Sequence, residues 1–408
     1  MYRPIVDSLS CPYCSSSRYT RRGWRQKKHE RVQLYRCGIC SKTFTAGPTR
    51  RKHYPLRVII TGLSMYNVGY SANTCCRIIK RRYKLTVKPS TISRWRKEFA
   101  PLCRFSRLRQ FAAGLYEPKD MILTSVLHHQ QVYRYQFHRA KCQFMVNLPD
   151  HRRFRSLQRF LEELPGSVPH DYFKDSNGSR SSQSALTFSK ADMIVRSKSS
   201  DASELAAFSL QAAYNRKNRH DTVENFMLAN DSVTIAAEVP VFIKREDLQH
   251  MRSNLGFEMY TSREELAGTA VSVSKLHAST PYIGKSQPLP SIITGHIDLL
   301  QIRNGQIRIL DYKPCAAKER PIEQLTVYAM ALSRHTGLRL YDFTCAWFDE
   351  VNYFEFYPLH VLLKPKEDRA RLHINTREGD YIINQDARRI VSLQPEHIPQ
   401  DKQEVWQL

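Results

Sequence analysis

Gly295-His296-Ile297-Asp298 is the first of two stretches that decide the fold. The second is Ile309-Leu310-Asp311-Tyr312-Lys313, in which Asp311 lies thirteen positions after Asp298. Alternating apolar residues lead into and out of Asn304-Gly305, a dipeptide typical of a two-residue hairpin turn. In such a hairpin Asp298 lies opposite the strand that carries Asp311 and Lys313. The latter two share a face, because side chains alternate along a strand. Two carboxylates and an ammonium group on one face suit a divalent metal ion and a hydrolytic water.

A further motif, Gln324-x-x-x-Tyr328, follows on what the sequence predicts to be the next helix. In this order the motifs resemble the PD-(D/E)XK nuclease superfamily, and in particular its RecB-type branch with a trailing Q-x-x-x-Y. The resemblance covers about residues 200–360 and implies an α/β restriction-endonuclease-like domain that uses Mg²⁺ or Mn²⁺. It also implies that Asp298 and Asp311 bind the metal and that Lys313 orients water or stabilises the transition state. Gln324 and Tyr328 would position the lysine, a phosphate or the DNA strand.

The same resemblance adds a histidine to the metal site. RecB-type nucleases carry a histidine on a helix that precedes the hairpin, and His220, at the start of a predicted helix, matches it by position. The residue alone is equally well explained as a helix cap or a surface group. Glu224 on this helix and Glu238 on a strand predicted over 233–242 are weaker candidates for the same site.

Positive charge is concentrated in the first quarter of the chain. Residues 1–110 hold 26 Lys and Arg against three acids, so +23 of the net charge of +25 lies there. A basic module joined to a nearly neutral remainder indicates that the partner is a polyanion, and DNA is the first choice.

Four cysteines within this basic segment form two C-x-x-C pairs, Cys11/Cys14 and Cys37/Cys40. Each pair supplies two thiolates from one tight turn, and four thiolates complete the closed tetrahedron of a structural zinc site. The segment between them, around Trp24, is typical of a small β-ribbon. Residues 1–50 resemble the zinc ribbon of insertion-sequence transposases.

Residues 51–110 are predicted to form three helices, over 55–66, from Ser71 to about Tyr83, and from Pro89. The third contains Ser90-Thr-Ile-Ser-Arg-Trp95 and resembles the recognition helix of transposase helix-turn-helix domains. Its basic residues, Arg94, Arg96 and Lys97, are the expected DNA contacts. Trp95 is expected in the core.

The remaining boundaries follow from composition. Residues 111–195 are predicted to be a linker and mixed region, with a loop or flexible joint at 177–184, residues 196–365 a nuclease domain, and residues 366–408 a C-terminal extension. The histidines at 128, 129 and 138 are expected at the surface or in the core. No apolar run approaches the roughly 20 residues of a membrane span, and paired cysteines favour metal binding in a reducing cytoplasm, here associated with the nucleoid.

The sequence therefore predicts a multidomain chain: a β zinc ribbon, a helical helix-turn-helix domain and an α/β nuclease domain. Its expected function is DNA binding and metal-dependent cleavage of DNA, in association with a mobile element. Two alternatives stay open: a transposase with an RNase-H-like core, and a sequence-specific DNA-binding regulator with an inactive nuclease domain. The target site, the polarity of cleavage and the oligomeric state, with a dimer as one option, are left open.

Overall fold

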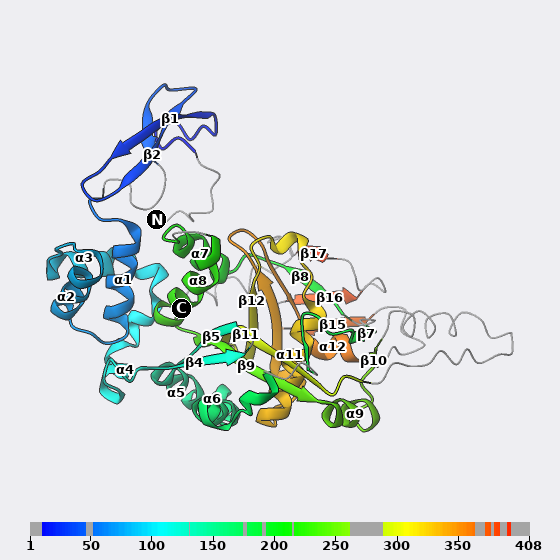
Figure 1. The fold of residues 1–408 in the computed structure, drawn as a ribbon. Helices are drawn as coiled ribbons and strands as arrows, with labels where there is room; N and C mark the ends of the chain where they lie inside the picture. Colours follow the sequence, from blue (N-terminus) through cyan, green and yellow to red (C-terminus); the bar gives the residue numbers. More distant parts are fainter. Residues whose placement is uncertain are drawn as a thin grey trace.

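The predicted hairpin lies near the centre of a large mixed sheet (Figure 1). β11 (Ile292–Arg303) and β12 (Gln306–Tyr312) pair antiparallel, with Leu299 opposite Leu310. Asn304 and Gly305 between them both have positive φ angles, 52° and 70°, as a type I′ turn requires. The prediction of this hairpin is confirmed.

The computed structural model describes residues 10–45, 52–129, 131–173, 178–189, 193–213, 216–261 and 289–363, and the backbone of three strands beyond them. The order of strands along the main sheet is β17 (Ile390–Ser392), β8 (Val195–Ser197), β14 (Tyr353–Phe356), β13 (Phe343–Phe348), β12, β11, β9 (Thr234–Lys244), β5 (Gln131–His138) and β4 (Ile122–His129). A two-residue strand, β6 (Ser179–Arg180), pairs in parallel with β11 at Ile293 and Thr294.

Residues 111–195 are therefore not a linker, since β4, β5 and β6 all belong to this sheet. The expected loop at 177–184 likewise contains β6. β4 and β5 lie at the sheet edge and alternate buried with exposed positions, which gives a weak apolar signal in the sequence. At the opposite edge β17 brings part of the predicted C-terminal extension into the sheet.

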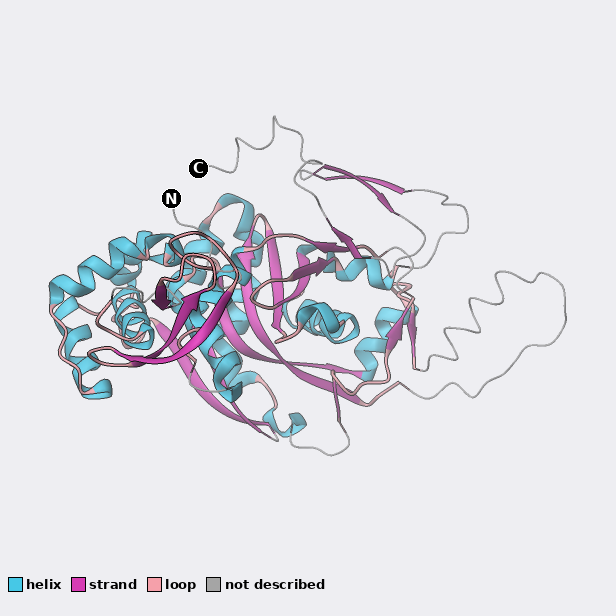
Figure 2. Ribbon diagram, turned by 90° about the horizontal axis from the view of Figure 1, so that it is seen from above, coloured by secondary structure: helices cyan, strands magenta, loops and turns pink. Residues whose placement is uncertain are grey.

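Helices cover both faces of the sheet (Figures 1 and 2). α11 (Ile322–Thr336) and α6 (Arg155–Ser167) share one apolar core with Ile307 and Ile309 of β12. α7 (Asp201–Leu210) and α8 (Arg219–Asn230) share a second core with Leu310 and Tyr312 of the same strand. β12 is buried on both faces, as is typical of a strand inside an α/β sheet.

The N-terminal elements match the predicted boundaries closely. β1 (Tyr19–Gln26), β2 (Arg31–Cys37) and β3 (Thr43–Thr45) form a small antiparallel sheet. α1 (Leu56–Asn67), α2 (Ala72–Tyr83) and α3 (Pro89–Glu98) follow it. The hydroxyl of Ser71 accepts the Thr74 N–H at 3.1 Å and so caps α2. Trp95 is buried, as predicted.

Of the three N-terminal helices, α1 packs directly on α8, and α2 and α3 pack against α1. Ile59, Ile92 and Trp95 lie in the same apolar core as Phe226 and Met227 of α8. A buried polar contact joins α1 to α8: Asn67 Nδ2 donates to Asn230 Oδ1 at 2.9 Å, and Asn230 Nδ2 donates to Ser64 Oγ at 2.8 Å. These helices are thus part of one packed body with α8.

The remaining regular elements are α4 (Arg109–Leu115), α5 (Arg139–Asn147), α9 (Arg245–Ser253), α12 (Pro358–Leu362), β7 (Thr187–Phe188), β10 (Met259–Tyr260), β15 (Leu372–Thr376) and β16 (Gly379–Ile383), with short 3₁₀ turns between them. Within the described part of the chain, no helix has the length and apolar character needed to cross a bilayer.

Candidate functional site

The site forms where β11 and β12 separate. Their backbone pairing is regular only as far as Leu299 and Leu310. Beyond this point the Tyr312 N–H donates to the side-chain oxygen Asp298 Oδ2 at 3.0 Å. A carboxylate therefore replaces the backbone carbonyl that would accept this hydrogen bond in a regular strand pair. The hairpin register places Asp311 opposite Asp298, and the two carboxylates face each other at this fork.

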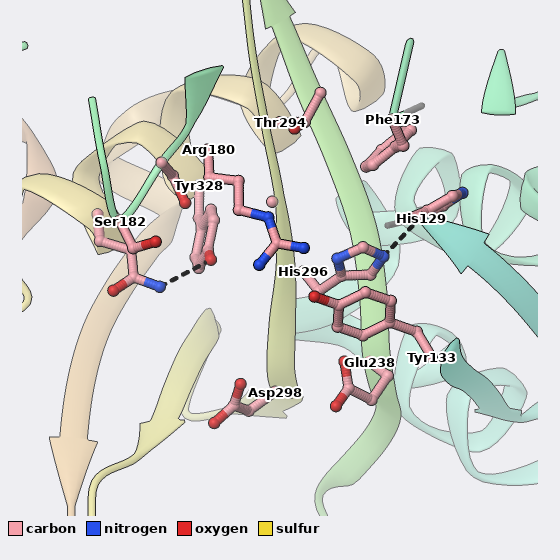
Figure 3. A pocket seen from close by; sticks show the side chains of 13 residues that line it. His129, Tyr133, Phe173, Arg180, Ser182, Glu238, Thr294, His296, Asp298 and Tyr328 are labelled. Atoms are coloured by element: carbon pink, nitrogen blue, oxygen red, sulfur yellow. Dashed lines mark hydrogen bonds between the residues drawn. The ribbon is translucent and has the colours of Figure 1, made fainter. Parts of the chain in front are cut away.

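Glu238 brings a third carboxylate to the fork from β9. Its φ angle is 52°, a left-handed conformation within a strand. For a residue with a Cβ this costs on the order of 1–3 kcal/mol and is found where the surrounding structure enforces it, commonly at functional sites. Figure 3 shows the Glu238 and Asp298 side chains at the same end of one pocket.

α8 supplies two more groups from one face. His220 and Glu224 are four residues apart, so their side chains lie on the same side of the helix. His220 Nδ1 lies 3.5 Å from Asp298 Oδ2. Potential ligand atoms of His220, Glu224 and Asp298 all lie within 4.8 Å of one another. The predicted set was His220, Asp298 and Asp311. Glu224, the weaker candidate, takes the place of Asp311 in the closest group.

Asp311 and Lys313 project from β12 on one face, as the spacing predicted. Lys313 Nζ lies 3.0 Å from Asp311 Oδ2, with the lysine side chain 24% exposed and the aspartate 4%. The lysine side chain is therefore partly exposed beside the carboxylate cluster.

Burial, and then mutual repulsion, shape the protonation of this cluster. Burial, and then the charge of Asp298, raises the pKa of Asp311 to about 8. Burial and Asp298 also raise the pKa of Glu238 to about 8, and burial raises that of Glu224 well above its ordinary value. Burial raises the pKa of Asp298 too, but the hydrogen bond and charge of His220 outweigh it and the net pKa is lowered. The metal-free cluster therefore holds protons at neutral pH.

The donor set fits a hard divalent cation. It consists mainly of carboxylate oxygens, the ligands that suit Mg²⁺ and Mn²⁺, together with one imidazole nitrogen. Glu224 Oε1 is buried and has no hydrogen-bond partner among the described residues. A buried polar atom of this kind normally has a partner, and a cation beside His220 and Asp298 would provide one.

Gln324 and Tyr328 line the pocket from α11. Gln324 Nε2 donates to the Tyr328 hydroxyl at 2.8 Å. The Tyr328 ring packs against Gly295, where an added Cβ would lie 2.2 Å from Tyr328 Cε1 and 2.8 Å from Ser181 Oγ. A glycine is therefore needed at position 295, because any larger side chain would collide with the tyrosine of the Gln-x-x-x-Tyr motif.

The pocket extends away from the carboxylates and has a volume of about 170 Å³ (Figure 3). Its walls include residues that the sequence did not single out: Tyr133, Phe173, Arg180 and His296, with His129 behind them. His296 lies inside the decisive motif, but only the aspartate there was assigned a role. Arg180 gave no signal, because β6 is two residues long.

The four cysteines form a separate cluster before and after the β1–β2 ribbon. Cys11 Sγ lies 3.5 Å from Cys40 Sγ, and Cys14 Sγ lies 3.5 Å from Cys37 Sγ. A tetrahedron with Zn–S of about 2.3 Å has S–S edges of about 3.8 Å, so the cluster is close to that size. The backbone N–H groups of Cys40 and Ile39 lower the pKa of Cys37 to about 6, which favours the thiolate.

The three basic residues of α3 are not equivalent. Arg94 and Lys97 are exposed. The Arg96 guanidinium instead stacks on Tyr66, 4.0 Å from the ring centroid, and the residue is half-buried. Only the first two are therefore free to contact a ligand in this conformation.

Comparison with known families gives a match. The family model described as the PD-(D/E)XK nuclease superfamily matches residues 179–388, an interval that contains His220, Glu224, Glu238 and both aspartates. Searches among curated proteins and among solved structures return no match.

The metal-free protein should lose stability as the pH rises from about 4 to about 8. The folded chain keeps the Asp311 proton up to a pKa of about 8, whereas the ordinary pKa of an aspartate is 3.8. Protonation therefore favours folding, and this contribution to stability is lost as the proton leaves.

Melting temperatures between pH 5 and 8 should fall more steeply for the wild type than for Asp311→Asn, and excess Mg²⁺ should reduce the fall. Glu163→Gln, an exposed acid of α6, is the control. Equal slopes for wild type and Asp311→Asn would contradict the described cluster.

The cysteine cluster should bind one Zn²⁺ per chain. Cys37→Ser removes one of four thiolate ligands and should lower the zinc content well below one equivalent by elemental analysis. Cys315→Ser, which replaces an exposed cysteine outside the cluster, should keep the full equivalent. Purified wild-type protein without zinc would refute the assignment.

Proposed function

The chain belongs to the PD-(D/E)XK nuclease superfamily, and from that premise we propose that it hydrolyses phosphodiester bonds of DNA in a metal-dependent reaction. The observation that carries the proposal is the convergence of His220, Glu224 and Asp298 beside the Asp311–Lys313 pair. A buried cluster of acids with raised pKa values beside an accessible lysine has little use in a purely structural domain.

Each side chain has a role that follows from its position. Glu224, Asp298 and His220 would hold Mg²⁺ or Mn²⁺, with Asp311 completing the site. When bound, such a cation lowers the pKa of a water and neutralises charge on the phosphate. Lys313, ion-paired to Asp311 and partly exposed, would orient the attacking water and stabilise negative charge as the bond breaks. Tyr328, held by Gln324, would position the substrate strand.

The N-terminal elements would provide most of the affinity for DNA. The ribbon would be held by structural zinc, and the strand β1 is exposed along its whole length and rich in arginine. α1 to α3 would act as a helix-turn-helix unit, with Arg94 and Lys97 of α3 as contacts. The combination supports a role in association with a mobile element, inside the cell and close to its DNA.

The two alternative functions are less well supported. An RNase-H-like transposase core does not fit, because the match to the nuclease superfamily covers the interval that holds both aspartates. A DNA-binding regulator with an inactive domain is disfavoured because Asp298, Asp311 and Lys313 are all present and gathered at the fork.

Cleavage should depend on the metal ligands and on the lysine in different ways. Asp298→Asn should reduce Mg²⁺-dependent cleavage of linear, circular and single-stranded DNA to background, since a ligand is weakened. Lys313→Ala should lower the rate by about 100- to 1000-fold, the loss typical of one preorganised donor, with Mg²⁺ affinity by calorimetry retained. Lys318→Ala, an exposed neighbour, should behave as wild type. A Lys313→Ala enzyme of full activity would disprove the role of the lysine, and an inactive wild type would disprove the function.

DNA binding should be strongly dependent on salt. With about six phosphate contacts, the slope of log K against log salt is expected to be about −5. The double variant Arg94→Ala/Lys97→Ala should make the slope shallower by about 2, measured by fluorescence anisotropy of a labelled duplex. Arg96→Ala should instead leave the slope unchanged, because that guanidinium packs on Tyr66. An unaltered slope in the double variant would place the DNA on another surface.

A further inference from the structure

The pocket beside the carboxylates has the size of one aromatic ring. Its volume is about 170 Å³, and a cavity of roughly 150 Å³ is known to admit benzene. One end is formed by Asp298 and Glu238, and the other by His129 and Phe173 (Figure 3). A group that fills this space therefore touches the metal site at one end and an aromatic wall at the other.

The aromatic wall is made of two stacked pairs. Tyr133 lies on His296 with ring centroids 3.6 Å apart and planes at 7°. Behind them, His129 lies on Phe173 at 3.8 Å and 16°. Rings held in this way present fixed flat surfaces, and a further planar ring gains stacking energy without ordering the wall.

A row of hydrogen-bonded imidazoles determines which ring nitrogen of His296 donates and which accepts. His170 Nε2 lies 3.2 Å from the Pro165 carbonyl oxygen, which only accepts, so this nitrogen carries the proton. His170 Nδ1 then accepts from His129 Nε2 at 2.9 Å, and His129 Nδ1 accepts from His296 Nε2 at 2.7 Å. Because Nε2 of His296 donates in this row, its other nitrogen, Nδ1, is left as a hydrogen-bond acceptor.

The same row of imidazoles excludes a metal at these histidines. His129 uses both of its ring nitrogens, one toward each neighbour. The three rings therefore form a row and do not converge on a point. Among the described residues, the groups that could hold an ion are the cysteine cluster and the trio on α8 and β11.

Arg180 adds a positive charge to the lining of this pocket. It is the only arginine or lysine among the described residues that line it. In Figure 3 its guanidinium lies between Tyr328 and His296, on the side that leads to Asp298. Planar guanidinium groups bind phosphate oxygens in a bidentate manner, and here the group stands between the aromatic wall and the metal site.

We propose that the pocket takes one unpaired nucleobase of the substrate strand, next to the phosphate that is cut, with Arg180 on the connecting backbone. The proposal rests on the proposed nuclease function and names its substrate. The base lies against Tyr133 and His296 and offers an N–H to His296 Nδ1. A base pair is too large for a space of this size, so the strand is single-stranded, or opened at the cut, when it reacts.

The test uses the full chain and an oligonucleotide whose cleavage positions have been mapped. Replacing the nucleotide beside the cut by an abasic one should lower the cleavage rate of the wild type about tenfold, as loss of one stacked base does. His296→Ala should also lower cleavage of the normal strand and should respond less to the abasic change than the wild type does, because the two changes remove part of the same contact. Tyr133→Phe keeps the platform and should retain the abasic effect. The matched control is His335→Ala, another half-buried histidine stacked on a phenylalanine, away from this pocket.

A second measurement needs no cleavage. An oligonucleotide carrying 5-iodouracil, irradiated with the protein in EDTA, should crosslink to Tyr133 or His296, as located by mass spectrometry. Wild-type cleavage that ignores the abasic change, together with crosslinks elsewhere, would overturn the base pocket and leave the nuclease function standing. Crosslinking at the pocket without any metal-dependent cleavage would support the pocket and refute the nuclease function instead.

Discussion

Burial of four carboxyl groups at one point of the sheet is the constraint on which the rest of the structure depends. Two of the four, Glu224 and Asp311, are almost fully buried, where a charged carboxylate loses its hydration. His220 and Lys313 supply only partial compensation. The surrounding elements must therefore hold the acids together, and they do so by burying β12 on both faces between two apolar cores. The site exists because the sheet around it is well packed.

The parts of this arrangement that the sequence predicted are those encoded locally. A two-residue turn such as Asn304-Gly305 fixes its own hairpin register, and the register in turn places Asp298 opposite Asp311. Alternation along a strand puts Lys313 on the face of Asp311. Helix boundaries were equally predictable where a cap such as Ser71 marks them. None of these inferences needs knowledge of a distant segment.

What the sequence could not predict depends on contacts between distant segments. Arg180 enters the site because two residues of β6 pair with β11, far along the chain, and so short a strand leaves no periodic pattern. Glu224, and not Asp311, joins His220 and Asp298 in the group of nearby ligand atoms, because α8 brings Glu224 next to Asp298. Arg96 looks exposed by spacing but stacks on Tyr66 from α1. In each case tertiary packing decided a role that the local pattern does not encode.

The buried link between Asn67 and Asn230 has a consequence for where the chain would cut. Breaking it leaves amide groups buried without partners, which costs about 1–3 kcal/mol, so α1 and α8 move as one piece. If α3 holds DNA and the fork beside α8 cleaves it, as proposed above, the distance between the two sites is set by the fold. The chain would then cut at a fixed number of nucleotides from the segment that it holds.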